Sequence, residues 1–215
     1  MTLDRRRTRS TDVEELLLKA ALHLLEQEGP EAVTVRRVAA SAGVAPMGVY
    51  NHFDGKNGLI DAVFQLGFAT LTEEMGTFAA IADTREALRQ GFRRYRRLAL
   101  DHPRTYEVMF LRAVPGFEPS EESKATARES FEALVHAVGR AMEDGVLAEG
   151  DPGSVAQLLW AACHGAVALE IADICLVADM SETYDDLVDA LLRGFSPPED
   201  RSGSPTPGAR RARAR

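Results

Sequence analysis

The chain has 215 residues, of which 45% are hydrophobic and 27% charged, and its formal net charge is −8. This is the composition of an ordinary soluble globular protein. We see no apolar run that approaches the ~18 residues of a membrane span, and the first residues lack the apolar segment of a signal peptide. Two cysteines are too few for a disulfide framework. We therefore expect a cytoplasmic protein without a membrane partner.

The acidic residues concentrate in the middle of the chain. Residues 57–200 hold 12 Lys/Arg against 25 Asp/Glu, residues 1–56 hold eight of each, and residues 201–215 hold five basic residues and no acidic one. A local basic patch, rather than the net charge, attracts phosphates. The overall acidity therefore does not exclude a nucleic-acid partner.

The two ends of the chain read as disordered basic segments. Residues 1–10 contain four arginines, and residues 196–215 are polar and rich in Pro and Gly. Two interpretations stay open for each end. One is a solvated terminus, and the other is a segment that contacts DNA phosphates or, for the first ten residues, the minor groove.

Residues 11–56 carry the signals of three short helices. An apolar stripe at helical spacing predicts a first helix from residue 11, which Gly29-Pro30 ends. Thr34 caps a second helix, Gly43 supplies a sharp turn, and Pro46 opens a third helix. Two helices joined by a glycine turn form a helix-turn-helix, whose second helix lies in the DNA major groove. We expect a DNA-binding domain here.

The third helix, PMGVYNHF, has one inward face. Val49 and Phe53 are four residues apart and should pack against the other helices. The other side, or its edge, then carries Met47, Gly48, Tyr50 and His52.

Residues 34–64, TVRRVAASAGVAPMGVYNHFDGKNGLIDAVF, resemble the DNA-binding domain of the TetR/AcrR family of transcriptional regulators. The similarity covers about the first 65 residues. It includes the glycine turn, the Tyr50-x-His52-Phe53 end of the third helix and the Lys56-x-x-Leu59 start of the next helix. This resemblance implies DNA contacts at Met47, Gly48, Tyr50 and His52. The positions and chemistry of Thr34, Arg36 and Lys56 make these three residues further candidates for DNA contact.

These residues suit different kinds of DNA contact. Thr34 and Lys56 stand at helix starts, where backbone N–H groups favour a phosphate, and Arg36 suits a guanine edge or a phosphate. Met47 and Gly48 cannot form a bidentate hydrogen bond with a base. We therefore expect modest base readout and a larger role for phosphate contacts and DNA shape. For Tyr50 and His52 a purely structural role stays open, and Arg37 is expected as a solvated charge.

The remainder is helical without strand-like alternation or internal repeats. A linking helix covers residues 57–80, and a ligand-binding and dimerisation domain covers residues 81–195. Within it we expect helices over about 83–100, 104–114, 120–143, 152–178 and 182–195. The predicted fold class is all-α, with an N-terminal helix-turn-helix domain and a C-terminal helical bundle.

The segment WAACHG, with Trp160, His164 and Gly165, resembles one TetR-family branch marked by a Trp-x-x-x-His-Gly signature. Apolar walls with a few polar anchors suit a small, mainly hydrophobic effector. The alternative is that these side chains are ordinary bundle core. The candidate ligand-binding residues are Phe92, Tyr95, Tyr106, Met109, Phe110, Phe131, Trp160 and His164.

Catalysis, metal binding and cofactors find no support in the sequence. There is no nucleophile elbow, phosphate loop or metal-spaced cluster. Cys163 and Cys175 are 12 residues apart, about 18 Å if both stand on one helix, which is too far for a disulfide. We expect no metal site, no cofactor and no enzymatic activity.

Dimerisation follows from the DNA geometry, because a single short recognition helix reads only a few base pairs and a two-fold dimer reads a palindrome. The long helices at 120–143 and 152–178 are the expected interface, where small residues allow close packing. These small residues are Ala161, Ala162, Gly165, Ala166 and Ala168.

We interpret the chain as a sequence-specific transcriptional regulator: a homodimeric repressor that binds a double-stranded palindromic operator and is released by a small effector. Two alternatives stay open. One is an activator of the same family, and the other is a helical ligand-binding or enzymatic domain with a vestigial helix-turn-helix.

Overall fold

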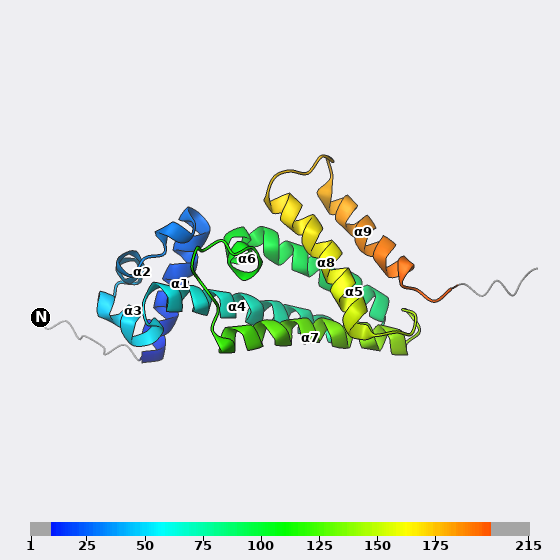
Figure 1. The fold of residues 1–215 in the computed structure, drawn as a ribbon, viewed down its shortest axis with the longest axis horizontal. Helices are drawn as coiled ribbons and strands as arrows, with labels where there is room; N and C mark the ends of the chain where they lie inside the picture. Colours follow the sequence, from blue (N-terminus) through cyan, green and yellow to red (C-terminus); the bar gives the residue numbers. More distant parts are fainter. Residues whose placement is uncertain (1–9, 199–215) are drawn as a thin grey trace, which may run out of the picture.

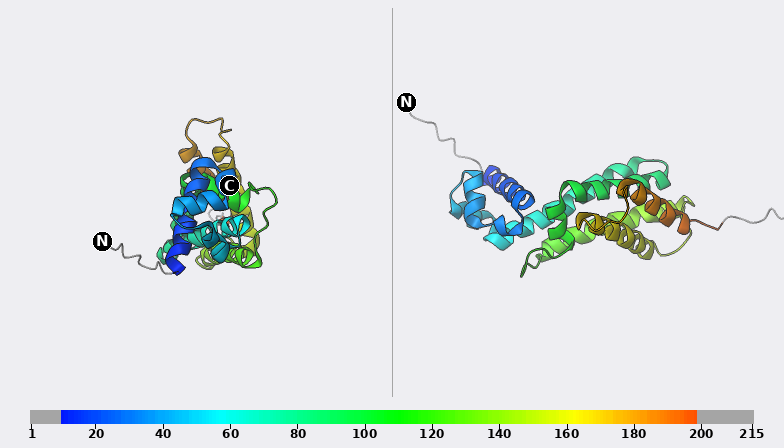
Figure 2. Two further views of the ribbon diagram at one scale, coloured as in Figure 1. Left: turned by 90° about the vertical axis from the view of Figure 1, so that its left-hand side faces the viewer. Right: turned by 90° about the horizontal axis from the view of Figure 1, so that it is seen from above.

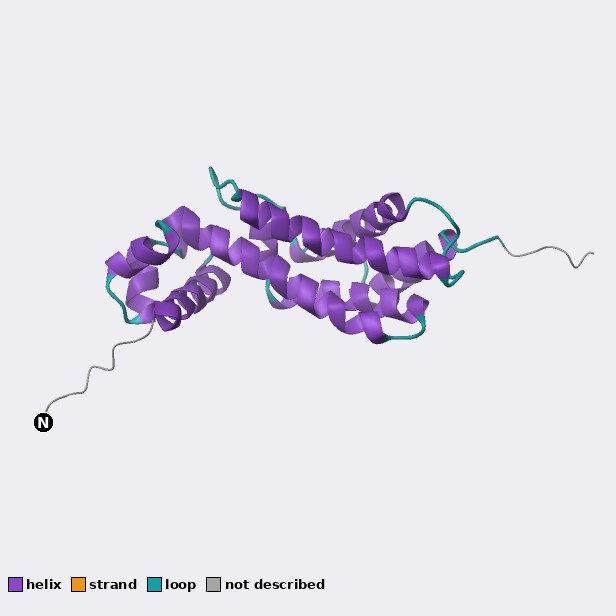
Figure 3. Ribbon diagram, turned by 90° about the horizontal axis from the view of Figure 1, so that it is seen from below, coloured by secondary structure: helices purple, strands orange, loops and turns teal. Residues whose placement is uncertain are grey.

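The fold is seen in a computed structural model that describes residues 10–198. Within this range the chain is entirely helical, with no strand, which confirms the predicted all-α class (Figures 1 and 3). The basic arm before Ser10 and the tail from residue 199 onward lie outside the described residues. The α-helices are α1 (Ser10–Glu28), α2 (Val35–Ala42), α3 (Pro46–Phe53), α4 (Lys56–Gly76), α5 (Thr84–Asp101), α6 (Pro103–Phe110), α7 (Glu121–Glu143), α8 (Pro152–Ile171) and α9 (Met180–Gly194).

The molecule is elongated, with α1–α3 at one end and α5–α9 at the other (Figures 1 and 2). Helix α4 joins the two ends. Its first half packs against α1 and α3, and its length lies along α6 and α7. Two short 3₁₀ segments, Pro30–Ala32 and Thr77–Ala80, make the connections before α2 and after α4. The buried side chains accordingly form two clusters, one at each end.

The small domain folds as its local signals predict. The Thr34 side chain accepts a hydrogen bond from the backbone N–H of Arg37 and so caps α2. Gly43 ends α2 in the left-handed conformation, at φ 68°, and Asp54 does the same after α3, at φ 53°. The core of this domain includes Val49 and Phe53 of α3, as expected.

The junction between α3 and α4 depends on Gly58. The carbonyl oxygen of Phe53 occupies the space that a Cβ at position 58 would take. Only glycine therefore allows the end of α3 to lie against the first turn of α4. Backbone packing at this junction fixes the angle between α3 and α4.

Arginines of α5 connect the helices of the large domain. Arg89 bonds Asp189 and Arg93 bonds Asp185, which ties α5 to α9. Arg96 makes a two-pronged contact with Glu170 on α8, and Arg94 makes one with Glu74 on α4. Such forked pairs fix geometry as well as charge. These four arginines therefore tie α5 to α4, α8 and α9.

The predicted helix over 152–178 is wrong in its last turns, because α8 ends at Ile171. Asp173 adopts a left-handed conformation, at φ 54°, which an α-helix cannot accommodate. A loop follows, and Asp179 caps α9 by accepting the N–H of Glu182. Cys175 lies in this loop, so it does not share a helix with Cys163 and the 18 Å separation does not apply.

Helix α8 is the one helix among residues 10–198 that is long and apolar enough to cross a membrane by length and composition. Our sequence expectation had found no such segment. The same composition arises in a core helix that also exposes an apolar face. Its inward face buries Ala156, Leu159, Cys163 and Val167 in the bundle.

Candidate functional site

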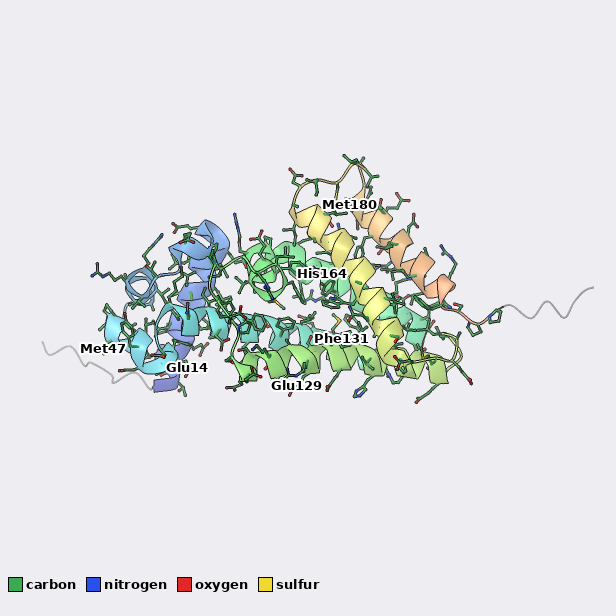
Figure 4. All side chains as sticks on the ribbon, in the orientation of Figure 1. Glu14, Met47, Glu129, Phe131, His164 and Met180 are labelled. Carbon is green, nitrogen blue, oxygen red and sulfur yellow. The ribbon has the colours of Figure 1, made fainter. Side chains whose placement is uncertain are left out.

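The first candidate site is the outer face of α2 and α3 at the tip of the molecule. Met47 lies near this extremity (Figure 4) and is 65% exposed, and Tyr50 is 55% exposed. The Tyr50 ring packs beside Gly55, since a Cβ there would stand 3.6 Å from Tyr50 Cε1. Gly55 has φ 94°, a backbone conformation that favours glycine. The turn at Gly55 therefore supports the Tyr50 ring.

The two neighbouring arginines of α2 differ in their partners. Arg37 forms an ion pair with Glu28 of α1, which corrects the expectation of a purely solvated charge. Arg36 is exposed and makes no hydrogen bond or ion pair with any described residue. The difference follows from the ~100° rotation between successive helical residues. Arg36 is therefore the arginine available to an external partner.

Two residues predicted to contact DNA, Gly48 and His52, lie closer to α1 than expected. A Cβ on Gly48 would meet Val13 Cγ1 at 3.8 Å and Leu17 Cδ1 at 4.0 Å. The His52 side chain is only 15% exposed, and its Nδ1 lies 3.9 Å from a carboxylate oxygen of Glu14. The physical reason is that residues 48 and 52 are one turn apart, on the side of the short helix that α1 covers.

The second candidate site is an apolar cavity of about 610 Å³ in the large domain. It is bounded by α4, α5, α6, α7 and α8, and its volume lies within the ~300–1,000 Å³ of small-molecule sites. Phe131 and His164 belong to this bundle, far from Met47 (Figure 4). Six of the eight predicted ligand residues line it: Phe92, Tyr95, Met109, Phe110, Phe131 and Trp160.

The other two predicted ligand residues lie beside this cavity instead of lining it. Tyr106 is buried and faces a second, smaller cavity. His164 lines neither cavity, because its ring stacks on Tyr106 with centroids 5.5 Å apart. The sequence placed both on the correct helices but did not give their rotation within the bundle.

A chain of polar groups connects these side chains. Trp160 Nε1–H donates to Tyr95 Oη at 3.3 Å, Tyr95 and Tyr106 hydroxyls are 2.9 Å apart, and Tyr106 Oη lies 2.5 Å from His164 Nδ1. Tyr95 Oη also lies 3.0 Å from His164 Nδ1, so the two hydroxyls and this ring nitrogen form a triangle. When Nδ1 accepts, the two hydroxyl protons can satisfy two sides of the triangle. A neutral imidazole then carries its proton on Nε2.

Burial shifts the pKa values of Tyr95, Tyr106 and His164. Desolvation raises the pKa of Tyr95 to about 12 and also raises that of Tyr106. It lowers the pKa of His164 below the ordinary value of 6.5. The tyrosines therefore stay protonated, and the imidazole stays neutral near pH 7. The cavity wall offers neutral hydrogen-bonding groups and no formal charge at this point.

Sequence reasoning missed the contribution of α4 to the cavity. Phe64, Phe68, Leu71 and Met75 line it, together with α7 residues such as Leu134. A signal was present, because α4 is apolar on more than one face, as a helix is when it is covered on several sides. We had assigned this helix only a linking role.

The described part of the chain offers no cluster of metal ligands. Residues 10–198 contain no group of three or more His, Cys, Asp or Glu that could hold a metal ion. Cys163 is buried, and desolvation raises the pKa of its thiol to about 12, which suppresses the reactive thiolate.

Two family models match this chain. One, described as bacterial regulatory proteins of the tetR family, matches residues 17–63. The other, described as a tetracyclin repressor-like C-terminal domain, matches residues 88–195. The chain belongs to the TetR family. The family resemblance read from the sequence is confirmed, and the protein is a DNA-binding transcriptional regulator with a helix-turn-helix in α2 and α3.

Relatives of this TetR-family chain agree with the assignment. An uncharacterized HTH-type transcriptional regulator of Mycobacterium tuberculosis is 27% identical over 187 residues, which cover 84% of this chain and 80% of that protein. A protein of unknown function from Rhodococcus sp. RHA1 has the same fold, with a TM-score of 0.79, 23% identity and coverage of 91% and 100% of the two chains.

A third similar structure contains a ligand. The complex of SmeT with triclosan has a TM-score of 0.65 and 21% identity to this TetR-family chain, and covers 91% of this chain and 99% of that one. At this identity the likeness shows the fold alone. The assignment to the Trp-x-x-x-His-Gly branch stays a prediction.

Proposed function

We propose that this protein is a homodimeric repressor that a small, mainly hydrophobic molecule releases from a palindromic operator. The observation that carries the proposal is the double role of α4. Its first turn lies behind the reading helix α3, through Gly58, and its later turns line the 610 Å³ cavity through Phe64, Phe68 and Leu71. One rigid element thus touches both sites.

The cavity suits a mostly apolar effector. Its wall is mainly aromatic and aliphatic, and its polar lining residues include Ser130, His136, Arg140 and Gln157 beside Tyr95 and Trp160. SmeT, a protein of similar fold, binds triclosan, which is such a molecule. A ligand that binds more tightly to one inclination of α4 shifts the population toward it and so changes operator affinity.

The face proposed for dimerisation narrows to α8 and the loop after it. Leu158 and Leu169 are 55% and 50% exposed, and Ala161 and Gly165 between them are exposed as well. In the loop Leu176 is fully exposed. The exposed face of α7 carries charged residues instead, and α7 packs along α4. We infer a two-fold contact through the α8 stripe, which is apolar and self-complementary.

For direct DNA contact we retain the seven predicted residues and rank them by geometry. Arg36, Met47 and Tyr50 project outward, and Thr34 and Lys56 stand at the starts of α2 and α4. Gly48 and His52 lie nearer α1 and would contribute through backbone approach and through a phosphate contact at the rim.

The test is a selection of bound DNA from a random pool with the purified full chain, followed by affinity measurements on the selected site. We expect Arg36→Ala and Tyr50→Ala to weaken specific binding roughly 10-fold or more each. Arg37→Ala is the matched control and should change affinity less, because Glu28 already engages that arginine. Unchanged binding for both test variants, in folded dimers, overturns the site.

Ligand release is tested on the same selected fragment. Triclosan serves as a first probe and should lower the operator affinity of the wild-type protein. The cavity-filling variant Ala133→Trp should lose this response while it keeps its DNA affinity, because Ala133 lines the cavity from α7. A response that survives Ala133→Trp places the effector elsewhere.

A further inference from the structure

A second cavity lies between the DNA-binding domain and the regulatory bundle. It has a volume of about 430 Å³, and α1 forms one wall while α4, α5 and α6 form the others. It shares Leu71, Tyr95, Met109 and Phe110 with the larger cavity, so these four side chains form a partition. None of the residues predicted to bind ligand or DNA lies on the α1 side of this cavity.

The lining of this cavity is partly apolar and partly polar. Leu22, Leu66 and Leu98 give it aliphatic walls next to the aromatic partition. Leu66 is 37% exposed although it is a large apolar residue on a helix that packs on several sides. The polar lining residues include Glu26 and Asp101, together with His23, Gln27, His102 and Thr105.

Glu26 is a carboxylate that lacks a cationic partner. Its Oε1 accepts hydrogen bonds from the backbone N–H and the hydroxyl of Thr105, at 2.9 and 2.6 Å, and its Oε2 accepts one from the N–H of Arg104, at 3.2 Å. It thereby caps α6 from α1. No ion pair joins Glu26 to any residue in the range 10–198. A carboxylate has about four acceptor positions, so Oε2 keeps one for a further donor.

We propose that this interdomain cavity is a second small-molecule site, which takes a monocationic amphiphile such as a short-chain alkylamine. The alkyl chain lies along the leucines, and the ammonium donates to Glu26 Oε2 without displacing α6. A charge-assisted hydrogen bond in a half-buried site is stronger than a neutral one. Asp101 adds a second carboxylate to the lining of the same cavity.

The position of the site gives its occupant a regulatory effect. The ligand would contact α1 of the reading domain and α6 of the bundle at once, and so would favour the relative placement of the domains seen here. Met109 connects the site to the larger cavity, because its sulfur fills the space beside Gly67 of α4 that a Cβ would take.

The experiment uses calorimetric titration of the full chain with n-octylamine, n-octanol and n-octanoate. We expect saturable binding of one octylamine per chain, and octanoate weaker by roughly 10-fold or more. Glu26→Gln should reduce this preference for the amine while octanol affinity stays the same. Equal affinity for the amine and the carboxylate in the wild-type protein overturns the proposal without any variant.

Matched variants locate the binding. Leu66→Trp and Thr70→Phe narrow the interdomain cavity from α4, and either should weaken octylamine binding roughly 10-fold or more. Ala133→Trp fills only the larger cavity and should leave octylamine binding intact. Loss of binding in Ala133→Trp, or undiminished binding in a folded Leu66→Trp or Thr70→Phe protein, overturns the assignment. Neither result bears on operator binding or on triclosan release.

Discussion

The helix-turn-helix domain (α1–α3), here called the reading domain, and the 610 Å³ cavity of the large domain are built from contacts of very different range along the chain. In the reading domain the cap of α2 joins residues three positions apart, and the ion pair of Arg37 spans nine positions. In the cavity wall the bonds between Trp160, Tyr95, Tyr106 and His164 span 11 to 69 positions. Local signals can specify the first region, whereas the second exists only after several helices have assembled.

The two regions also differ in how much their key residues contribute to the stability of the fold. Met47 and Tyr50 are more than half exposed, so they are available for binding and contribute little to packing. Tyr95 and Tyr106 are buried and hydrogen-bonded, so they support stability as well as any ligand contact. Substitutions should therefore separate function from stability in the reading domain and couple them in the cavity.

The largest effect on stability is expected for Gly58→Ala, at the junction between α3 and α4. The new Cβ would collide with the backbone carbonyl of Phe53, which cannot rotate away as a side chain can. We expect a loss of at least ~2 kcal/mol in the free energy of unfolding, measured by chemical denaturation. Gly76→Ala is the control, because nothing lies within 4 Å of a Cβ there. A Gly58→Ala protein as stable as this control would show that the junction is not fixed by backbone contact.

The next effect is expected for Tyr95→Phe in the cavity wall. The change removes the acceptor of Trp160 Nε1–H, which is half-buried, and a partner of Tyr106, which is buried. We expect a loss of about 1–2 kcal/mol in denaturant unfolding. Tyr50→Phe removes an exposed hydroxyl and should change stability by less than ~0.5 kcal/mol. Equal effects for the two variants would remove the contrast between the regions.

A smaller effect, confined to DNA binding, is expected for Met47→Arg. The exposed side chain can be replaced without loss of packing, and an added cation near phosphates should steepen the salt dependence of binding by about one unit of log–log slope. Binding to nonspecific DNA at several salt concentrations measures the slope. An unchanged slope would mean that the tip of α3 does not approach the phosphates.

The smallest effect is a pH dependence from His164. Burial lowers its folded-state pKa below 6.5, so the unfolded chain binds more protons between the two pKa values. Its contribution to stability is therefore complete above about pH 6.5 and declines as the pH falls toward the folded pKa. The stability difference between wild type and His164→Gln should shrink between pH 7.5 and 5. A difference that is constant over this range would contradict a neutral, buried imidazole.

The sequence by itself determined the helical class, the family and the position of most helices. Thr34, Gly43 and Pro46 define the helix-turn-helix through capping and backbone conformation, which act within a few residues. Periodic apolar positions placed the helices of the bundle, and aromatic residues indicated a cavity, six of whose eight predicted lining residues line it. These signals are short-range, so they can be read without the fold.

Only the tertiary structure decided which way several of these side chains point and which helices meet. It turned Gly48 and His52 toward α1, placed His164 behind Tyr106, and made α4 a wall of the cavity. It also brought Glu26 to the start of α6, 78 and 79 positions away along the chain. The physical reason is that helix rotation and pairing depend on packing between distant segments, which no local pattern encodes.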